Sequence, residues 1–181
     1  MSASKIRGKI LWVLWAAGKP MTIQGISEKA GLTSSSTNEY LPGLIKAKYV
    51  SVPQEQYYAV TNLGKQAMGL PKVDKNLALN ILTPVSVEKA FHFYYGLNQH
   101  SGVYADSLKD FVDKIQNIDL RCVEFHVPRK DFELWIRSLG DLELSKKLEL
   151  LRMRKLSGED PRKELYETVN SRYEELSKLT L

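Results

Sequence analysis

The residues of this chain best suited to chemistry are its three histidines and the carboxylates near them. His92 and His126 fall in two β-like runs, with Glu124 just before His126 and Asp131 just beyond it. Two histidines and one carboxylate on neighbouring strands are a ligand set for a divalent transition metal. A half-buried histidine that is hydrogen-bonded to a carboxylate is the commoner arrangement, and it is the interpretation we favour. His100 is expected to lie exposed in a turn.

A second candidate is the run Arg129-Lys130-Asp131, which follows a β-like stretch. In the simpler interpretation, Asp131 caps the next helix and the two basic side chains are solvated or pair with Glu133. The sequence contains no phosphate-binding loop, no nucleophile motif and no dinucleotide-binding glycine pattern. The single Cys122 is expected in the core, and it excludes an internal disulfide and a cysteine-rich zinc site. We therefore expect no enzymatic activity, no cofactor and no metal.

The distribution of charge indicates a partner for the N-terminal half. The chain has 181 residues and a formal net charge of +5. Residues 1–75 hold ten Lys or Arg and four Asp or Glu, a net charge of +6, whereas residues 76–181 hold 16 basic and 17 acidic groups, a net charge of −1. A segment that contacts phosphate is expected to be basic in this way. A lysine-rich surface also serves solubility, but we favour nucleic acid as the partner.

The composition is that of a globular protein with one domain or two small ones, because 43% of the residues are apolar and 26% are charged. No segment approaches the roughly 18 uninterrupted apolar residues that a membrane helix needs. The apolar run at residues 10–17 lacks the cleavage site of a signal peptide. We therefore expect a cytoplasmic protein with no membrane contact.

The N-terminal half has the pattern of a helix-turn-helix. Apolar residues recur at helical spacing in residues 5–17, which form the first expected helix. Two short helical patterns follow at residues 23–30 and 34–48. The Gly-Leu-Thr turn between them has a glycine that suits a left-handed helix stop, and its Thr33 can cap the next helix.

A predicted β-hairpin follows these helices. Two β-rich runs, residues 49–52 and 57–60, are joined by Pro53-Gln54-Glu55-Gln56. The chain then becomes helical again at Thr61, with Gly64 small enough for close packing.

This order of elements resembles the winged helix-turn-helix domain of bacterial and archaeal transcription regulators. The motifs that carry the resemblance are Ala-Gly-Leu-Thr at residues 30–33, Leu-x-x-Leu-Ile at residues 41–45, the two-stranded wing, and Tyr-x-Val-Thr-x-x-Gly-x-x-Ala at residues 58–67. The resemblance covers about residues 5–68. It implies that residues 34–48 form a DNA recognition helix.

The outward side chains of that helix and the nearby cations are the candidate DNA contacts. At 100° per residue, Leu41, Leu44 and Ile45 define the buried face of the helix. Serine hydroxyls can bond phosphate or bases, and Asn38 can reach an adenine edge. The outward-facing residues are then Ser35, Ser36, Glu39, Gly43 and Lys46. The predicted contacts are Ser34, Ser35, Ser36, Thr37, Asn38, Lys46, Lys48, Lys5, Arg7 and Lys9.

Several features argue against a strong, specific DNA reader. Arginine makes the commonest contact to guanine, and this helix contains none. Glu39 points toward the expected phosphates. Pro42-Gly43 lies in mid-helix, where proline removes a backbone bond to Asn38 and costs about 3 kcal/mol in a regular helix. The wing tip at residues 53–56 carries no Lys or Arg. The alternative is a protein-interaction module in which the winged helix is a scaffold within a larger complex.

The C-terminal half begins after a boundary at residues 68–87, in which the apolar residues 77–82 are expected to pack as a short strand or helical turn. The elements expected beyond it are strands at residues 90–95, 103–105 and 122–127 and helices at residues 107–117, 130–139, 141–156 and 161–179. The motif Ala-Asp-Ser-Leu-x-x-Phe followed by Glu-Phe-His-x-x-Arg-x-Asp-Phe-x-x-Trp-Ile is similar to a small domain of uncharacterised archaeal and bacterial proteins. That resemblance implies a fold and no activity.

Together these patterns predict an α+β protein in four parts. The parts are a winged helix-turn-helix domain at residues 1–70, a boundary segment at 71–87, a small α/β domain at 88–140 and a C-terminal helical hairpin at 141–181. We expect a DNA-binding protein, a dimeric transcription regulator that binds double-stranded DNA.

The C-terminal module is then expected to dimerise, to sense a ligand or to recruit a protein partner. The last helix carries an apolar stripe that either packs on its own domain or in part forms a homodimer interface. Trp12 and Trp15 in the first helix are expected to pack against the next helices or against a second subunit. The resemblance to winged helix-turn-helix domains, whose first helix often contributes to dimers, implies association if one of them is exposed. The residues of the stripe are Leu165, Val169, Tyr173, Leu176 and Leu179.

Overall fold

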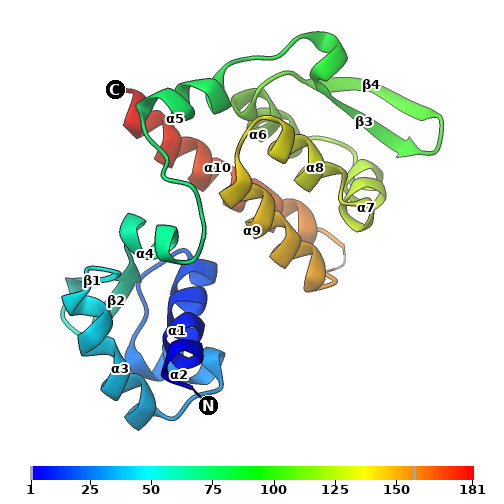
Figure 1. The fold of residues 1–181 in the computed structure, drawn as a ribbon. Coiled ribbons are helices and arrows are strands. Elements are labelled where there is room, and N and C mark those ends of the chain that lie inside the picture. Colours follow the sequence, from blue (N-terminus) through cyan, green and yellow to red (C-terminus); the bar gives the residue numbers. More distant parts are fainter. Residues whose placement is uncertain (1, 157) are drawn as a thin grey trace. The chain divides into compact units, whose positions relative to one another are not determined.

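The computed structural model describes residues 2–156 and 158–181, and its fold is a mixture of α-helices and two small antiparallel β-hairpins (Figure 1). The chain divides into two compact units, an N-terminal unit that ends at Lys72 and a C-terminal unit from Val73 to Leu181. Each unit has its own hydrophobic core. Within the described ranges, no helix has both the length and the apolar character needed to cross a bilayer. The predicted α+β class is confirmed.

The N-terminal unit consists of three helices, a two-stranded hairpin and a short fourth helix. These elements are α1 (Ala3–Ala17), α2 (Ile23–Ala30), α3 (Ser34–Lys46), β1 (Val50–Gln54), β2 (Tyr57–Val60) and α4 (Asn62–Ala67). Apolar side chains from α1, α2, α3 and β1 form its core. The arrangement is consistent with a winged helix-turn-helix, as the order of the sequence patterns predicted.

The turn between α2 and α3 has the predicted caps. Gly31 ends α2 in the left-handed conformation, with φ of 61°. The Thr33 side chain accepts a hydrogen bond from the Ser36 amide at 3.1 Å and so begins α3. Thr22 caps α2 in the same way through the Gly25 amide, at 3.2 Å. These bonds satisfy amide groups that a helix start otherwise leaves without a partner.

Helix α3 is two residues shorter than predicted and continues through its proline. It ends at Lys46, and Lys48 beyond it has φ of 60°. Pro42 lies inside the helix, where it cannot donate the usual backbone bond to the Asn38 carbonyl. Both Pro42 and Gly43 are exposed, so water can satisfy that carbonyl.

The hairpin β1–β2 has a tighter turn than the four-residue loop that the sequence predicted. Gln54 pairs with Tyr57, which leaves Glu55 and Gln56 as the turn, and Gln56 has φ of 63°. The hairpin is tied to the start of α2 because Met21 and Tyr58 exchange backbone bonds of 2.9 and 2.8 Å. Met21 thus adds an isolated β-bridge to the hairpin.

Gly64 sets the approach of α4 to the rest of its unit. A Cβ atom at this position would lie 2.3 Å from the Tyr49 carbonyl oxygen and 2.9 Å from a Val60 methyl carbon. Thr61, at the start of α4, donates a hydrogen bond to the Lys48 carbonyl at 2.6 Å. The predicted close packing at Gly64 is confirmed, and it joins α4 to the segment after α3.

The C-terminal unit is built around its last helix. Its elements are α5 (Lys75–Leu82), the 3-10 turn η1 (Val87–Lys89), β3 (Phe91–Gly96), β4 (Gln99–Ala105), α6 (Leu108–Ile115), α7 (Leu120–Arg129), α8 (Asp131–Ser138), α9 (Leu142–Met153) and α10 (Asp160–Thr180). Helix α10 contacts α5, α6, α7 and α9 (Figure 1). The C-terminal unit therefore has one core. This core includes α5, which lies in the predicted boundary segment, and it contains residues from both sides of the predicted division between residues 140 and 141.

The predicted strand at residues 122–127 is wrong, because this segment belongs to helix α7. Its buried residues Cys122, Val123 and His126 have helical spacing. Asp119 caps the helix through the Arg121 amide, and Pro128 lies in the last turn. A short apolar run fits a buried strand or a buried helix equally well, so its spacing alone could not distinguish them.

The apolar stripe of α10 is used within its own unit. Leu165, Val169 and Leu176 are buried in the core, and Tyr173 packs against it. Leu179 alone among the five predicted stripe residues is exposed, with 39% of its surface accessible. The stripe therefore stabilises the C-terminal unit.

Candidate functional site

The outward face of α3 is the first candidate site. Ser35, Glu39, Gly43 and Lys46 are exposed and Ser36 is half-buried, as the helical spacing predicted. Two further candidate contacts, Ser34 and Asn38, are also exposed. The first turn of α3 therefore presents a series of uncharged hydrogen-bonding groups to solvent.

Thr37 is not part of this surface. Its side chain is completely buried, and its hydroxyl bonds the Ser27 hydroxyl at 2.8 Å and the Thr33 carbonyl at 3.2 Å. It therefore joins α2 to α3 and cannot contact a partner. The prediction of Thr37 as a contact is wrong because Thr37 lies on the same side of α3 as the buried Leu41 and Leu44.

The predicted basic contacts lie on α1 and at the end of α3. Lys5, Arg7, Lys46 and Lys48 are exposed, and no carboxylate among the described residues forms an ion pair with them. Lys9 is exposed as well, but its ammonium group donates a hydrogen bond to the Ala30 carbonyl at the end of α2, at 3.2 Å. None of the five predicted cations is neutralised by an ion pair within the described residues, and only the Lys9 ammonium group is held by a hydrogen bond.

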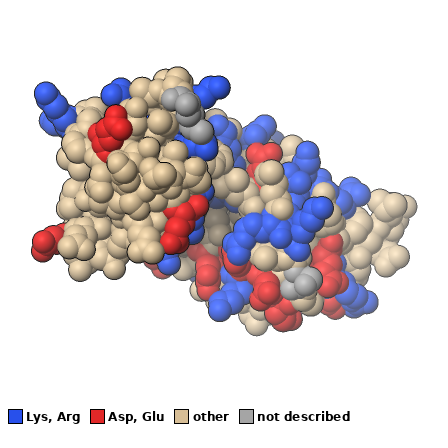
Figure 2. Space-filling model, turned by 90° about the horizontal axis from the view of Figure 1, so that it is seen from below, with Lys and Arg blue, Asp and Glu red and all other residues tan. Residues whose placement is uncertain are grey.

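The rest of the N-terminal unit carries few charges. Residues 2–72 contain nine basic and three acidic side chains, a net charge of +6. Figure 2 shows this unit, at the left of the view, as a mostly uncharged surface with scattered basic and acidic groups. The hairpin β1–β2 and its turn contain no basic residue, and Glu55 lies at the turn. Five of the nine basic residues therefore lie on α1 or at the end of α3, and the other four are spread over the rest of the unit.

Arg7 makes a contact with α3 that the sequence did not predict. Its guanidinium carbon lies 5.9 Å from the centre of the Tyr40 ring. Its Nη2 atom lies 3.9 Å from the position that a Cβ atom would take at Gly43. Spacing along one helix gives no information on contacts between helices, so this part of the site required the structure.

The histidines of the C-terminal unit are arranged differently from the sequence prediction. His126 lies on α7 and is buried, whereas His92 lies on β3. The Nε2 atom of His126 accepts a hydrogen bond from the Tyr94 amide at 2.9 Å, so its proton lies on Nδ1, which donates to Asp131 at 2.7 Å. Both ring nitrogens are thus occupied, and neither is free for a metal or for proton transfer to a substrate. The favoured interpretation, a histidine bonded to a carboxylate, is confirmed for His126.

The sequence predicted that Asp131 caps α8, but its side chain makes no capping hydrogen bond. It accepts hydrogen bonds from His126 and from Arg129 Nε, the latter at 3.0 Å. Burial lowers the pKa of His126 from its ordinary value of 6.5, although the hydrogen bond and charge of Asp131 act in the opposite direction. Glu133 is buried and pairs with Arg152 at 2.7 Å. The predicted interaction of the Arg129-Lys130 pair with Glu133 is therefore replaced by the contact of Arg129 with Asp131.

His92 and His100 form a hydrogen-bonded chain along the hairpin β3–β4. The Gly102 amide donates to Nδ1 of His100 at 2.8 Å, so His100 carries its proton on Nε2. That nitrogen lies 3.2 Å from Nδ1 of His92, and Nε2 of His92 lies 2.8 Å from the Val87 carbonyl. His100 is exposed, as predicted, but lies in strand β4 and not in a turn.

These groups do not assemble a metal site. Over residues 2–156 and 158–181, no group of three or more His, Cys, Asp or Glu side chains is arranged to hold a metal ion. Cys122 is buried in the core, as predicted, and burial raises the pKa of its thiol.

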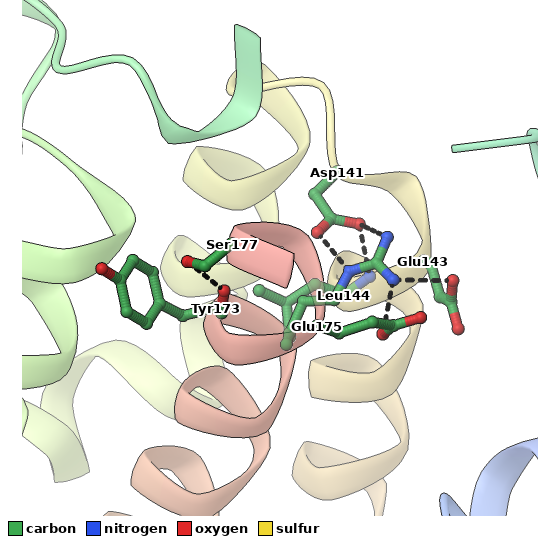
Figure 3. Close-up of polar contacts among 7 residues, drawn as sticks. Asp141, Glu143, Leu144, Tyr173, Glu175 and Ser177 are labelled. Carbon is green, nitrogen blue, oxygen red and sulfur yellow. Dashed lines mark hydrogen bonds and ion pairs between the residues drawn. The ribbon is translucent and has the colours of Figure 1, made fainter. Parts of the chain in front are cut away.

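The most highly charged buried cluster lies between α9 and α10. Arg172 is 2% exposed and bonds Asp141 through two nitrogens, at 2.7 and 3.0 Å. Glu143 and Glu175 also accept from this guanidinium, at 3.0 and 2.8 Å, so three carboxylates converge on it (Figure 3). Burial acts to lower the pKa of Arg172, but the three carboxylates raise it above its ordinary value. Because Asp141 also caps α9 through the Leu144 amide, the cluster joins two helices and has a structural role.

Comparison with models of known protein families, with curated proteins and with solved structures gives no match to this chain. The proposal below therefore depends on the chain's own residues and geometry.

Proposed function

We propose that the protein binds double-stranded DNA through the N-terminal unit and acts as a transcription regulator. Helix α3 enters the major groove, with Ser35, Asn38 and Lys46 toward the bases and the nearest phosphates. The observation that carries the proposal is the order of three helices and a hairpin, which is consistent with a winged helix-turn-helix, together with an exposed face of α3 and exposed cations on α1 and after α3 that have no acidic partners in the described structure.

The contacts divide into two kinds. Lys5, Arg7 and Lys48 contribute charge near the phosphates, which raises affinity without selecting a sequence. The exposed hydroxyls and amide of the first turns of α3 are groups that can bond base edges. The start of α3 also favours phosphate, because its free amide groups carry partial positive charge.

The test is fluorescence anisotropy with a labelled random duplex of about 30 base pairs, titrated at several salt concentrations. We expect the logarithm of the binding constant to fall linearly with the logarithm of the salt concentration, with a slope of about −0.9 per phosphate contact. A triple variant, Ser35→Ala, Ser36→Ala and Lys46→Ala, is expected to lose most of this binding.

The matched control is Lys178→Ala, which removes an exposed lysine from the C-terminal unit. It is expected to bind like the unchanged protein. Equal binding by the triple variant and the control would show that α3 is not the DNA-contacting helix. Absence of binding by the unchanged protein even at low salt would overturn the DNA-binding proposal.

The proposed regulator is a homodimer, and Trp12 is the residue that favours this. It is 44% exposed on α1, with its ring 4.9 Å from that of the buried Trp15. Exposed tryptophan is enriched in protein interfaces. Sedimentation of the unchanged protein and of Trp12→Ser measures the association. Dimers that persist in the variant would place the interface elsewhere.

A second candidate function is a protein-interaction module without DNA binding. Glu39 is exposed on the outward face of α3, and the hairpin β1–β2 is without basic residues. Both features suit a protein surface better than a groove lined by phosphates. Failure of the anisotropy experiment, together with capture of a defined partner that Glu39→Lys abolishes, would favour this function.

A further inference from the structure

Helix α3 lacks an arginine, but Arg7 of α1 places a guanidinium beside it. The guanidinium carbon lies 5.9 Å from the centre of the Tyr40 ring. Its Nη2 atom lies next to Gly43, which has no side chain to exclude it. Tyr40 is half-buried, so its ring has a defined position in the unit. A planar guanidinium is commonly held over an aromatic ring in this way, and its in-plane donors remain available.

Gly43 leaves room for this guanidinium next to the α3 backbone. A methyl group at Gly43 would lie 3.9 Å from Arg7 Nη2, which is an ordinary van der Waals contact, whereas a longer side chain would enter the space of the guanidinium. Arg7 therefore takes the place that a side chain of α3 would occupy. Gly43 also lies on the exposed face of α3, so the guanidinium lies at the surface that is proposed to meet DNA.

The charge of Arg7 is not neutralised by a neighbour. Among the described residues no carboxylate forms an ion pair with it. Glu39, the acidic residue of α3, forms no ion pair with Arg7 either. Arg7 lies against the surface of α3 without an acidic partner, and this contact removes part of its conformational freedom before any ligand binds. Ligand binding therefore costs less side-chain entropy.

We propose that Arg7 is the specificity-determining residue of the DNA site and that it bonds the O6 and N7 atoms of a guanine in the major groove. This inference rests on the proposed DNA-binding function. A fork of two nitrogens matches those two acceptors, and no arginine of α3 competes for the position. Tyr40 positions the guanidinium, and Gly43 admits it.

The experiment is selection of bound duplexes from a random pool, followed by affinities for the selected site and for each of its single-base-pair variants. The unchanged protein is expected to select at least one invariant guanine. Arg7→Lys keeps the charge but loses the fork, so we expect affinity for the selected site to fall about 5- to 150-fold and the preference for that guanine to disappear. Preferences at the other positions of the site are expected to remain.

Variants at Gly43 test the geometry without changing any charge. Gly43→Leu is expected to reproduce the loss of guanine preference, whereas Gly43→Ala, whose methyl group fits, keeps it. Lys5→Ala is the control for charge on α1, and it is expected to lower affinity for all sequences by the same factor. Circular dichroism of each variant establishes that α3 is folded.

Three results would overturn the inference. They are a selected site without an invariant guanine, an equal loss for all sequences in Arg7→Lys, and an unchanged preference in both Arg7→Lys and Gly43→Leu. Each of these leaves the proposed DNA binding intact. Absence of binding to any duplex by the unchanged protein would overturn both proposals together.

Discussion

The two units of this protein use charged side chains in opposite ways. In the N-terminal unit the cations Lys5, Arg7, Lys46 and Lys48 are exposed and lack acidic partners in the described structure. In the C-terminal unit, several arginines pair with carboxylates, and the pairs of Arg152 and Arg172 are largely or wholly buried. In Figure 2, basic and acidic groups intermingle at the right of the view and are sparse at the left.

This difference distinguishes charges that stabilise a fold from charges that are available to a ligand. A buried cation that is surrounded by carboxylates cannot be removed without leaving those carboxylates uncompensated. An exposed cation without an intramolecular partner contributes little to the free energy of unfolding but keeps its full field for an anionic partner. Net charge alone gives +6 for residues 2–72 and −1 for the remainder, and it does not show this distinction.

The largest expected effect is the loss of stability of the C-terminal unit in Arg172→Leu. The substitution leaves Asp141 and Glu143 buried without their cation, and we expect the free energy of unfolding of this unit to fall by about 3–5 kcal/mol. Hydrogen exchange of peptides from each unit, measured against urea concentration, reports the two units separately. The N-terminal unit is expected to be unchanged.

Two comparison variants sharpen this prediction. Arg121→Ala breaks an exposed pair with Asp119 and is expected to have a much smaller effect. Adding Asp141→Asn and Glu143→Gln to Arg172→Leu removes the uncompensated charges, so part of the stability should return. If Arg121→Ala were as harmful as Arg172→Leu, the contrast between buried and exposed pairs would be wrong.

The second expected effect is confined to the N-terminal unit. Gly64→Ala places a methyl group 2.3 Å from the Tyr49 carbonyl oxygen, which is backbone and cannot rotate away. We expect a loss of about 1–3 kcal/mol from overpacking, because α4 must move outward. Urea unfolding followed by peptide-resolved exchange would show the loss in residues 2–72. As a control, Gly8→Ala has open space around the added methyl group and is expected not to destabilise the unit.

The sequence predicted the parts of this fold that depend on local signals. Thr33 and Gly31 marked the turn between α2 and α3 because capping and the left-handed conformation have strong residue preferences. The segment at residues 122–127 was misassigned because β-branched and aromatic residues suit either element when they are buried. The placement of Thr37 at the surface failed because its side chain lies on the buried face of α3 and its hydroxyl has partners there.

The candidate site was predicted less completely than the fold. The exposed residues of α3 follow from one helical period, which a sequence contains. The contact of Arg7 with Tyr40 and Gly43 depends on how α1 crosses α3, and the pairing of His126 with Tyr94 and Asp131 depends on how α7 meets β3. Such contacts between distant segments leave no periodic signal along the chain.

The third expected effect is a pH dependence of the C-terminal unit. Since burial lowers the pKa of folded His126 below 6.5, the unfolded chain takes up this proton first as the pH falls. The stabilisation is therefore complete above about pH 6.5 and is lost as the pH falls through the lower pKa of the folded state. We expect the urea midpoint of the C-terminal unit to decrease as the pH falls below about 6.5.

His126→Gln tests the origin of this dependence, since its amide can accept from Tyr94 and donate to Asp131 without titrating. The variant should lose the part of the pH dependence that His126 contributes. The double variant His92→Gln, His100→Gln removes the other histidines of the unit and is expected to keep it. A slope that survives in His126→Gln and vanishes in the double variant would assign the dependence to the hairpin instead.

The smallest expected effect on stability, and the sharpest contrast with Arg172, is that of Lys46→Ala. Lys46 is exposed in the last turn of α3 and has no ion pair within the described ranges, so we expect its removal to change the unfolding free energy of the N-terminal unit by no more than about 0.5 kcal/mol. The same substitution is expected to reduce the salt slope of DNA binding by about one phosphate contact. Urea unfolding and anisotropy on one preparation measure both quantities. A variant that lost stability and left the salt slope unchanged would make Lys46 a structural cation like Arg172, and the distinction between the two units would not hold at this residue.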